Sequence, residues 1–163
     1  MSKTIRSVAF LCACFLLPQL VSAEDVYLDT QVKLRKPKKK SKRSQEGGLN
    51  HVPFRIWLPE NVKSIRGVVF NPFYTKAVTQ KHWQAACRQW GFGILAANFF
   101  GAKQDEIPAM INTALATFAT KSGHKELAKA KMCLVGMSAG AGMSTRIAEH
   151  LPDRTLAMGP VCL

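Results

Sequence analysis

The segment Gly136-Met137-Ser138-Ala139-Gly140 holds the residues whose types and spacing best suit chemistry, because it fits the pattern G-x-S-x-G. This pattern presents a serine nucleophile on a sharp turn when a buried strand precedes it and a helix follows it. Both neighbours are predicted here, since residues 132–135 form an apolar run and residues 139–150 have a helical pattern. The glycines let the strand and the helix pass close together. A serine packed among small residues in a tight turn is the alternative interpretation.

A nucleophilic serine needs hydrogen-bond donors for the negative charge that develops on a substrate oxygen. The backbone N–H of Ala139 is one candidate donor, because Ala139 begins the predicted helix, whose dipole favours an anion at that end. The glycines of Gly140-Ala141-Gly142 also suggest a dinucleotide-binding loop, but Thr145 replaces the third glycine of that motif. Nucleophilic chemistry is therefore favoured over nucleotide binding.

A general base for this serine is hard to find in the sequence. His150 lies at the far end of the predicted helix, roughly 18 Å from Ser138 at about 1.5 Å rise per residue, whereas a base must come within roughly 3 Å. His124 follows a predicted helix and His51 precedes a predicted strand, so both are expected at the edge of the sheet opposite the serine. His82 opens a helix and could lie near the site, with a surface or capping role as its alternative. Without a base, Ser138 is a weak nucleophile at neutral pH.

The elements that must position these residues alternate between strand and helix. Strand-like apolar runs cover residues 54–58, 67–70, 92–100, 132–135 and 156–163. Helical patterns lie between them, one behind a Thr79 cap and ending at Gly91, one behind an Asp105 cap and ending at Gly123, and one over 139–150. This alternation predicts an α/β fold, with a mostly parallel sheet and helices on both faces. Ser138 is then expected at the carboxyl ends of the strands, where such sheets bind their ligands.

The first 23 residues have the composition of an export signal. Lys3 and Arg6 precede the apolar run 8–17, and small residues lead up to a cleavage site that we place after Ala23. An uncleaved anchor is one alternative, but the apolar run is only about half of the roughly 20 residues that a membrane span needs. A lipoprotein cleavage box at 11–14 is another, although it falls too early in the run. We therefore expect a secreted or periplasmic protein.

Residues 24–50 are predicted to be a linker, because they lack apolar periodicity and carry a run of basic side chains. Eight basic residues and no acidic ones lie between Lys33 and Arg43, in a chain whose net charge is +13. Behind an export signal, this run suits contact with an anionic surface or acts as a passive tether, and no specific nucleic-acid partner is expected. The whole sequence is 47% hydrophobic, which is typical of globular proteins, and residues 51–163 are assigned to one domain.

The cysteines and histidines show no spacing typical of metal ligands, so no metal or organic cofactor is expected. Cys87, Cys133 and Cys162 remain after the predicted cleavage, and because three is an odd number at least one thiol is expected to be free. Cys133 and Cys162 fall in strand-like runs, where cysteine usually acts as a small buried hydrophobic residue.

Residues 67–163 resemble the α/β-hydrolase family, in the branch of exported esterases that includes polyhydroxybutyrate-depolymerase-like and dienelactone-hydrolase-like proteins. The segment Ser122-Gly123-His124-Lys125-Glu126-Leu127-Ala128, which leads through the strand 132–135 into the G-x-S-x-G segment, carries this resemblance. It implies a serine hydrolase that acts on small-molecule or polymeric carboxylic esters. It also implies a second oxyanion donor in the loop after the strand 67–70, where the backbone N–H of Phe73, or otherwise of Tyr74, follows Asn71-Pro72. Aromatic packing over the sheet edge is the alternative role for both residues.

The same resemblance implies that part of the active site is missing. The acid and the histidine of the family follow the serine, on loops after later strands, whereas this chain ends 25 residues after Ser138. We therefore expect a partial domain, truncated after the strand that follows the helix 139–150, with an unpaired strand at its edge. The expected serine esterase is inactive or feeble. The alternative is a non-catalytic module that binds an anionic surface through residues 33–43.

Overall fold

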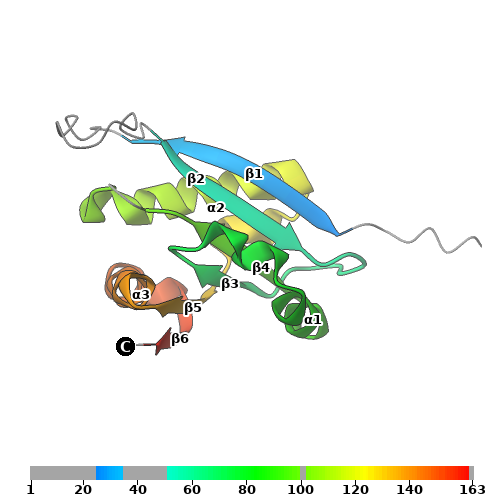
Figure 1. Cartoon of the computed structure of the whole chain (residues 1–163). Coiled ribbons are helices and arrows are strands. Elements are labelled where there is room, and N and C mark those ends of the chain that lie inside the picture. The colour runs from blue at the N-terminus through cyan, green and yellow to red at the C-terminus, as the bar shows by residue number, and fades with distance from the viewer. Residues whose placement is uncertain (1–24, 35–50, 100–101, 162–163) are drawn as a thin grey trace, which may run out of the picture.

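The computed structural model describes residues 25–34, 51–99 and 102–161, which form a six-stranded sheet flanked by helices (Figure 1). The strand order is β1-β2-β4-β3-β5-β6. The strands are β1 (Val26–Lys33), β2 (His51–Leu58), β3 (Gly67–Asn71), β4 (Phe92–Ala97), β5 (Met132–Met137) and β6 (Thr155–Val161). The helices are α1 (Lys81–Trp90), α2 (Ile107–Ser122) and α3 (Ala139–His150). Short 3₁₀ turns complete the described chain: η1 (Thr75–Thr79), η2 (Gln104–Glu106), η3 (Lys125–Lys129) and η4 (Pro152–Arg154).

The sheet is mixed, with a parallel part that carries the candidate site. Strands β4, β3, β5 and β6 pair in parallel, whereas β2 pairs antiparallel with both β1 and β4. Every residue of β4 from Gly93 to Ala97 is buried, as expected for a central strand that is covered on both faces. The α/β class predicted from the sequence is confirmed, and β2 falls on the predicted strand 54–58; strand β1 and the antiparallel direction of β2 were not predicted.

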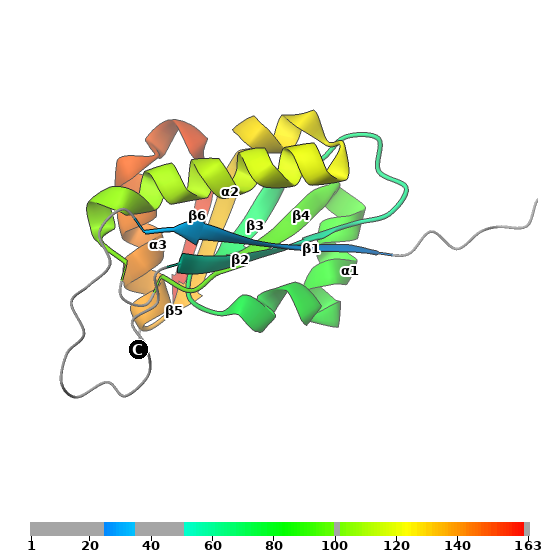
Figure 2. The ribbon, with the colours of Figure 1, turned by 90° about the horizontal axis from the view of Figure 1, so that it is seen from above.

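Two layers of helix cover the two faces of the sheet (Figure 2). Apolar side chains of α2 and Ile147 of α3 pack into one buried cluster with residues of β2, β3 and β5. Cys87 of α1 and the η1 residues Ala77 and Val78 pack into a second cluster with Trp57, Ile94 and Ala96. Helices on both faces are therefore present, as the sequence predicted.

The predicted linker 24–50 needs a correction, because residues 26–33 form strand β1 at the edge of the sheet. Leu28, Thr30 and Val32 alternate with more exposed residues, which is the period-two pattern of a half-buried strand. Its charged neighbours obscured this pattern in the sequence. Arg55 of β2 reaches Asp29 with its Nε atom, 2.6 Å from the carboxylate, and helps to hold the strand in register. Residues 1–24 and 35–50, with the predicted leader and most of the basic run, lie outside the described residues.

Two helix starts also differ from the sequence prediction. Helix α1 begins at Lys81, and Thr79 instead closes η1, where its hydroxyl donates to the carbonyl oxygen of Lys76. Asp105 lies in η2, two residues before α2 begins at Ile107. The predicted helix ends are confirmed, because Gly91 and Gly123 take left-handed conformations, with φ of 68° and 79°, at the two C-caps.

Strand β6 forms the other edge of the described sheet and is exposed over almost its whole length. Leu156, Met158 and Val161 keep 53%, 46% and 54% of their surface accessible. Among the described residues β6 pairs with β5 alone, so its outer backbone groups have no strand beside them. The sequence predicted such an edge, which leaves apolar side chains and unpaired backbone groups together at the surface.

Candidate active site

Ser138 lies at the junction of β5 and α3, at the edge of the sheet where the parallel strands end. Its backbone has φ 52° and ψ −118°, a conformation that residues other than glycine rarely adopt. Such strain persists only where the surrounding structure enforces it, and it gathers at functional sites. The side chain is exposed and does not cap α3. A buried packing serine, the alternative from the sequence, does not fit this exposure.

The backbone of this turn is fixed from both sides. The N–H of Ser138 donates to the carbonyl oxygen of Val161 at 3.1 Å, which ties the turn to the end of β6. Its carbonyl oxygen accepts from the N–H groups of Ala141 and Gly142, at 2.9 and 3.2 Å, in the first turn of α3. Strand β6 and helix α3 therefore fix the position of this turn. These hydrogen bonds all use the backbone of Ser138, so they do not engage its hydroxyl.

The two glycines of the motif both lie at close approaches of the backbone. A β-carbon on Gly136 would meet the backbone of Gly140, so β5 and α3 touch directly below the serine. A β-carbon on Gly140 would lie 3.3 Å from the β-carbon of Phe73. The loop after β3 therefore runs beside the start of α3, and the structure brings Phe73 to the same turn as Ser138.

The backbone N–H groups of Ala139 and Phe73 are the candidate donors near this turn, and they differ in their hydrogen bonding within the protein. Ala139 is the first residue of α3, and a first helical residue has no acceptor for its N–H within the helix. The N–H of Phe73 instead donates to Oδ1 of Asn71 at 3.1 Å, and the N–H of Tyr74 donates to the same oxygen at 2.9 Å. The sequence predicted Phe73 as a donor to a substrate, whereas the structure shows that donor engaged by Asn71.

Asn71 is the residue that sequence reasoning missed. The signal was present, because an asparagine before a proline often begins a turn in which its side chain accepts from N–H groups two and three residues ahead. Pro72 has no N–H of its own, so the donors after β3 begin at Phe73. The carboxamide of Asn71 thus closes the loop that the resemblance assigned to oxyanion binding.

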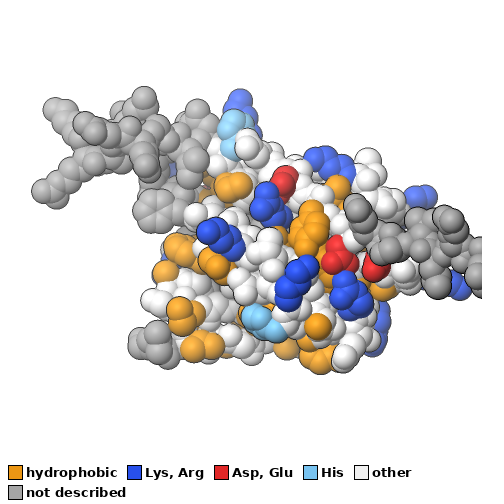
Figure 3. Space-filling model, turned by 45° about the vertical axis from the view of Figure 1, so that its right-hand side comes forward, with side chains coloured by type: hydrophobic (Ala, Val, Ile, Leu, Met, Phe, Trp, Pro, Cys, Tyr) orange, Lys and Arg blue, Asp and Glu red, His pale blue; other side chains and the backbone are white. Residues whose placement is uncertain are grey.

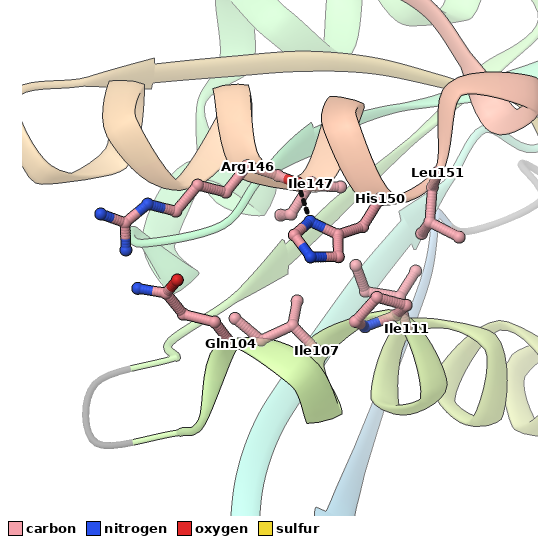
Figure 4. A pocket seen from close by; sticks show the side chains of 8 residues that line it. Gln104, Ile107, Ile111, Arg146, Ile147, His150 and Leu151 are labelled. Atoms are coloured by element: carbon pink, nitrogen blue, oxygen red, sulfur yellow. Dashed lines mark hydrogen bonds between the residues drawn. The ribbon is translucent and has the colours of Figure 1, made fainter.

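The sequence predicted that His150 and His124 lie far from the serine, and the structure agrees. Nδ1 of His150 is 2.8 Å from the carbonyl oxygen of Arg146, and its ring lies beside Ile107 and Leu151 between α2 and α3 (Figure 4). His124 contacts Glu126, which accepts from the N–H of Ile65, before β3 and β5 begin. His124 therefore lies at the edge of the sheet opposite Ser138, and His150 lies at the far end of α3 from Ser138.

The placement predicted for His51 is wrong. It begins β2, and because β2 runs antiparallel to β4, this strand starts at the edge where the parallel strands end. His51 consequently shares an edge with Ser138, although β2 is three strands from β5, or roughly 14 Å at about 4.8 Å between strands. His82 is exposed on α1, where its ring lies edge-on to Trp83. Among the described residues, no histidine or carboxylate is hydrogen-bonded to the Ser138 hydroxyl.

The two thiols that the structure describes, those of Cys87 and Cys133, show no sign of nucleophilic activation, and Cys162 lies outside the described residues. Burial first, and then the charge of nearby Cys133, raise the pKa of Cys87 to about 11. Burial also raises the pKa of Cys133. Both residues line an apolar groove of about 680 Å³ beside α1, together with Trp83, Trp90 and Val135, and Ser138 does not line it. Within the ranges that the structure describes, no three His, Cys, Asp or Glu side chains gather to hold a metal ion.

Comparisons with protein-family models and with curated protein sequences give no match. An acetyl xylan esterase from Aspergillus awamori has a similar structure, with a TM-score of 0.50 and 19% identity over 68% of this chain and 47% of that one. The chain has the α/β-hydrolase fold.

Other solved structures are also similar to this chain. A cold-adapted esterase from an Arctic intertidal metagenomic library has a TM-score of 0.48 and 16% identity, over 83% of this chain and 58% of that one. A bacterial heroin esterase has a TM-score of 0.49 and 14% identity, over 83% of this chain and 42% of that one. This chain therefore spans about half the length of the solved structures that it matches. At these identities the similarity concerns the α/β-hydrolase fold alone.

Proposed function

We propose that this protein is a serine hydrolase of carboxylic esters whose nucleophile is Ser138. One observation carries the proposal: an exposed serine is held in a strained conformation with a positive φ, between a central parallel strand and the helix that follows it. Gly136 is needed for that geometry because a β-carbon there would meet the backbone of Gly140, and Gly140 itself lies close to Phe73. The α/β-hydrolase fold places this turn at the carboxyl edge of the sheet, where ligands of such sheets bind.

The proposed reaction begins when the Ser138 oxygen attacks the acyl carbon and the carbonyl π electrons move to the carbonyl oxygen. The N–H of Ala139, and that of Phe73 when it is released from Asn71, donate to this oxyanion. The intermediate collapses to an acyl-serine as the alkoxide leaves and takes up a proton, and water then releases the acid. The serine proton passes to solvent, because no base contacts the hydroxyl in the described residues. Loss of triad partners lowers rates by factors of roughly 10⁴ to 10⁶, so the expected activity is feeble.

The test is covalent labelling of the full chain with a fluorophosphonate, in which the serine oxygen displaces fluoride from phosphorus. Labelling should be slow, should map to Ser138, and should vanish in Ser138→Ala. Ser144→Ala is a matched control, because Ser144 lies on α3, the helix that follows Ser138, with its hydroxyl fully buried. Equal labelling of wild type and Ser138→Ala would remove this serine from the mechanism. Labelling as fast as that of a complete serine esterase would contradict the absence of a general base from the described surroundings of Ser138.

No described residue supplies an acid or a histidine beside Ser138. We propose that these partners belong to strands that follow residue 163 in a complete domain, in keeping with the triad order of α/β-hydrolases. The DNA downstream of the gene tests this proposal. A continuing frame with an acid and then a histidine after two further strand patterns would support it, and an unrelated downstream sequence would oppose it.

A second candidate function is attachment to an anionic surface through residues 33–43. The topology favours it, because β1 ends at Lys33 and β2 begins at His51, so the basic run connects two strands at the edge that carries Ser138. Basic side chains also outnumber acidic ones on the face of the described domain in Figure 3. Binding to an anionic polymer should weaken steeply with salt and should be lost when the basic residues of 35–43 become glutamine. Salt-independent binding would refute this role.

The proposed location is the periplasm or the exterior of the cell, with cleavage after Ala23. None of the helices in the ranges that the structure describes combines the length and apolar character needed to cross a bilayer. N-terminal sequencing of the exported chain tests the location, and Glu24 is the expected first residue. A chain that keeps Met1 or stays in the cytoplasm would contradict it.

A further inference from the structure

We propose that the side chain of Asn71 is an internal competitor for the oxyanion site and lowers the reactivity of Ser138 in the resting protein. This inference rests on the proposed function, since it concerns the donors for that serine. The observation behind it is that one carboxamide oxygen accepts from two consecutive N–H groups, of Phe73 at 3.1 Å and of Tyr74 at 2.9 Å. Both donors thus point to a single position, which an uncharged oxygen of the protein now occupies.

The position of the loop makes this occupancy relevant to the serine. Phe73 lies against Gly140, two residues after Ser138, so its backbone runs beside the turn that holds the nucleophile. Pro72, which is buried, supplies no N–H and restricts the backbone before Phe73. The backbone donors that follow Pro72 therefore begin with the Phe73 N–H, and Asn71 holds that donor.

Competition follows from hydrogen-bond energetics. A substrate oxyanion would form a charge-assisted bond with the Phe73 N–H, which is stronger than the neutral bond to the Asn71 amide. The oxyanion can therefore displace the carboxamide, but the energy of the broken bond is subtracted from the stabilisation of the transition state. Removing the internal acceptor should accelerate attack by Ser138 by about three- to tenfold. A residue that merely holds the loop in shape predicts the opposite sign.

The experiment measures the fluorophosphonate labelling rate of Ser138 in wild type, Asn71→Ala, Asn71→Asp and Thr79→Ala. Asn71→Ala should label about three- to tenfold faster. Asn71→Asp keeps an acceptor and adds a negative charge beside the developing one, so it should label more slowly than wild type. Thr79→Ala is the matched control, because it removes a side-chain hydrogen bond at the other end of η1 and touches neither donor. Its rate should equal that of wild type.

Amide hydrogen exchange provides a second readout that does not depend on serine reactivity. Exchange at Phe73 and Tyr74 should be faster in Asn71→Ala than in wild type, with the exchange of β3 unchanged. Slower or unchanged labelling of folded Asn71→Ala overturns the competition, and so does unchanged exchange at Phe73. If Asn71→Ala does not fold, labelling of Asn71→Asp at the wild-type rate overturns it. If exchange responds but no variant labels Ser138, the proposed esterase function fails, and the hydrogen bond is then only structural.

Discussion

Gly136 approaches Gly140 so closely that a β-carbon on Gly136 would lie 2.4 Å from the carbonyl carbon and the carbonyl oxygen of Gly140. Backbone atoms cannot swing aside as the end of a flexible side chain can. The last residues of β5 and the first turn of α3 therefore pass in direct contact, and this contact sets the corner on which Ser138 stands.

Gly136→Ala should consequently destabilise the protein by about 1–3 kcal/mol, the usual cost of inserting a carbon into a packed region. Gly142→Ala is the matched control, because a β-carbon at Gly142 meets nothing within 4 Å and alanine is the better helix former. That variant should be neutral or more stable by up to about 1 kcal/mol. Urea unfolding of the two variants measures the difference. Equal stability of both would show that the corner is looser than its geometry indicates.

The strain at Ser138 predicts a trade between stability and reactivity. A non-glycine residue in such a conformation lowers the stability of the folded protein by about 1–3 kcal/mol. Glycine avoids this cost, but its greater freedom in the unfolded chain lowers stability by about 0.5–1 kcal/mol. Ser138→Gly should therefore be more stable than Ser138→Ala by about 1 kcal/mol, although both remove the nucleophile. Thermal and urea unfolding of the two variants check this. Ser138→Ala as the more stable of the pair would mean that the turn is relaxed.

The pH dependence of ester hydrolysis tests whether Ser138 works without a histidine base, since none of the described histidines is hydrogen-bonded to it. With such a base, the rate levels off above the imidazole pKa of about 6.5. Here the rate per Ser138 should keep rising between about pH 6 and pH 9, because a serine without a base reacts through its small alkoxide fraction. Subtracting the rate of Ser138→Ala removes the background. A plateau near neutral pH that disappears in His51→Gln or His82→Gln would show that one of these histidines reaches the serine.

The lowered pKa of Glu126 leads to a prediction of how the stability of the protein changes at acid pH. Its partial burial raises the pKa, but the N–H of Ile65, its own N–H and the contact with His124 lower it, and the net result is a pKa below the ordinary 4.5. A carboxyl group with a lowered folded-state pKa contributes stability that is present above its unfolded-state pKa and is lost as the pH falls through its folded-state pKa.

Glu126→Gln should therefore be less stable than wild type at about pH 7, and the gap should narrow as the pH falls below about 4.5. Glu149→Gln, at the exposed end of α3, is the control and should match wild type throughout. Urea unfolding at a series of pH values gives the comparison. A gap of constant size would assign the effect to packing rather than to the charge.

The two described thiols should react slowly in the folded protein. A pKa of about 11 leaves Cys87 with very little thiolate near neutral pH, and the side chain is only 2% exposed. Cys133 faces the groove and is less buried, so it should react with iodoacetamide before Cys87 does. Site-resolved mass spectrometry in buffer and in denaturant measures both rates. Modification of folded Cys87 at its unfolded rate would show that α1 opens readily.

The sequence by itself determined the local features of this protein. The alternation of apolar runs and helical faces predicted the parallel part of the sheet, and the G-x-S-x-G spacing located the turn at Ser138. These features depend on residues close in sequence, so periodicity and glycine positions reveal them. For the same reason the ends of α1 and α2 at Gly91 and Gly123 were predictable.

Only the tertiary structure decided which segments meet. It added 26–33 to the sheet as β1, because pairing with β2 supplies partners that a short strand with many charges does not reveal alone. It placed His51 at the sheet edge that carries Ser138, because the direction of β2 is set by its antiparallel pairing with β4. It also showed the Phe73 N–H held by Asn71, a contact set by loop geometry rather than by residue type. Long-range pairing and exact side-chain direction follow from packing, which a local pattern does not contain.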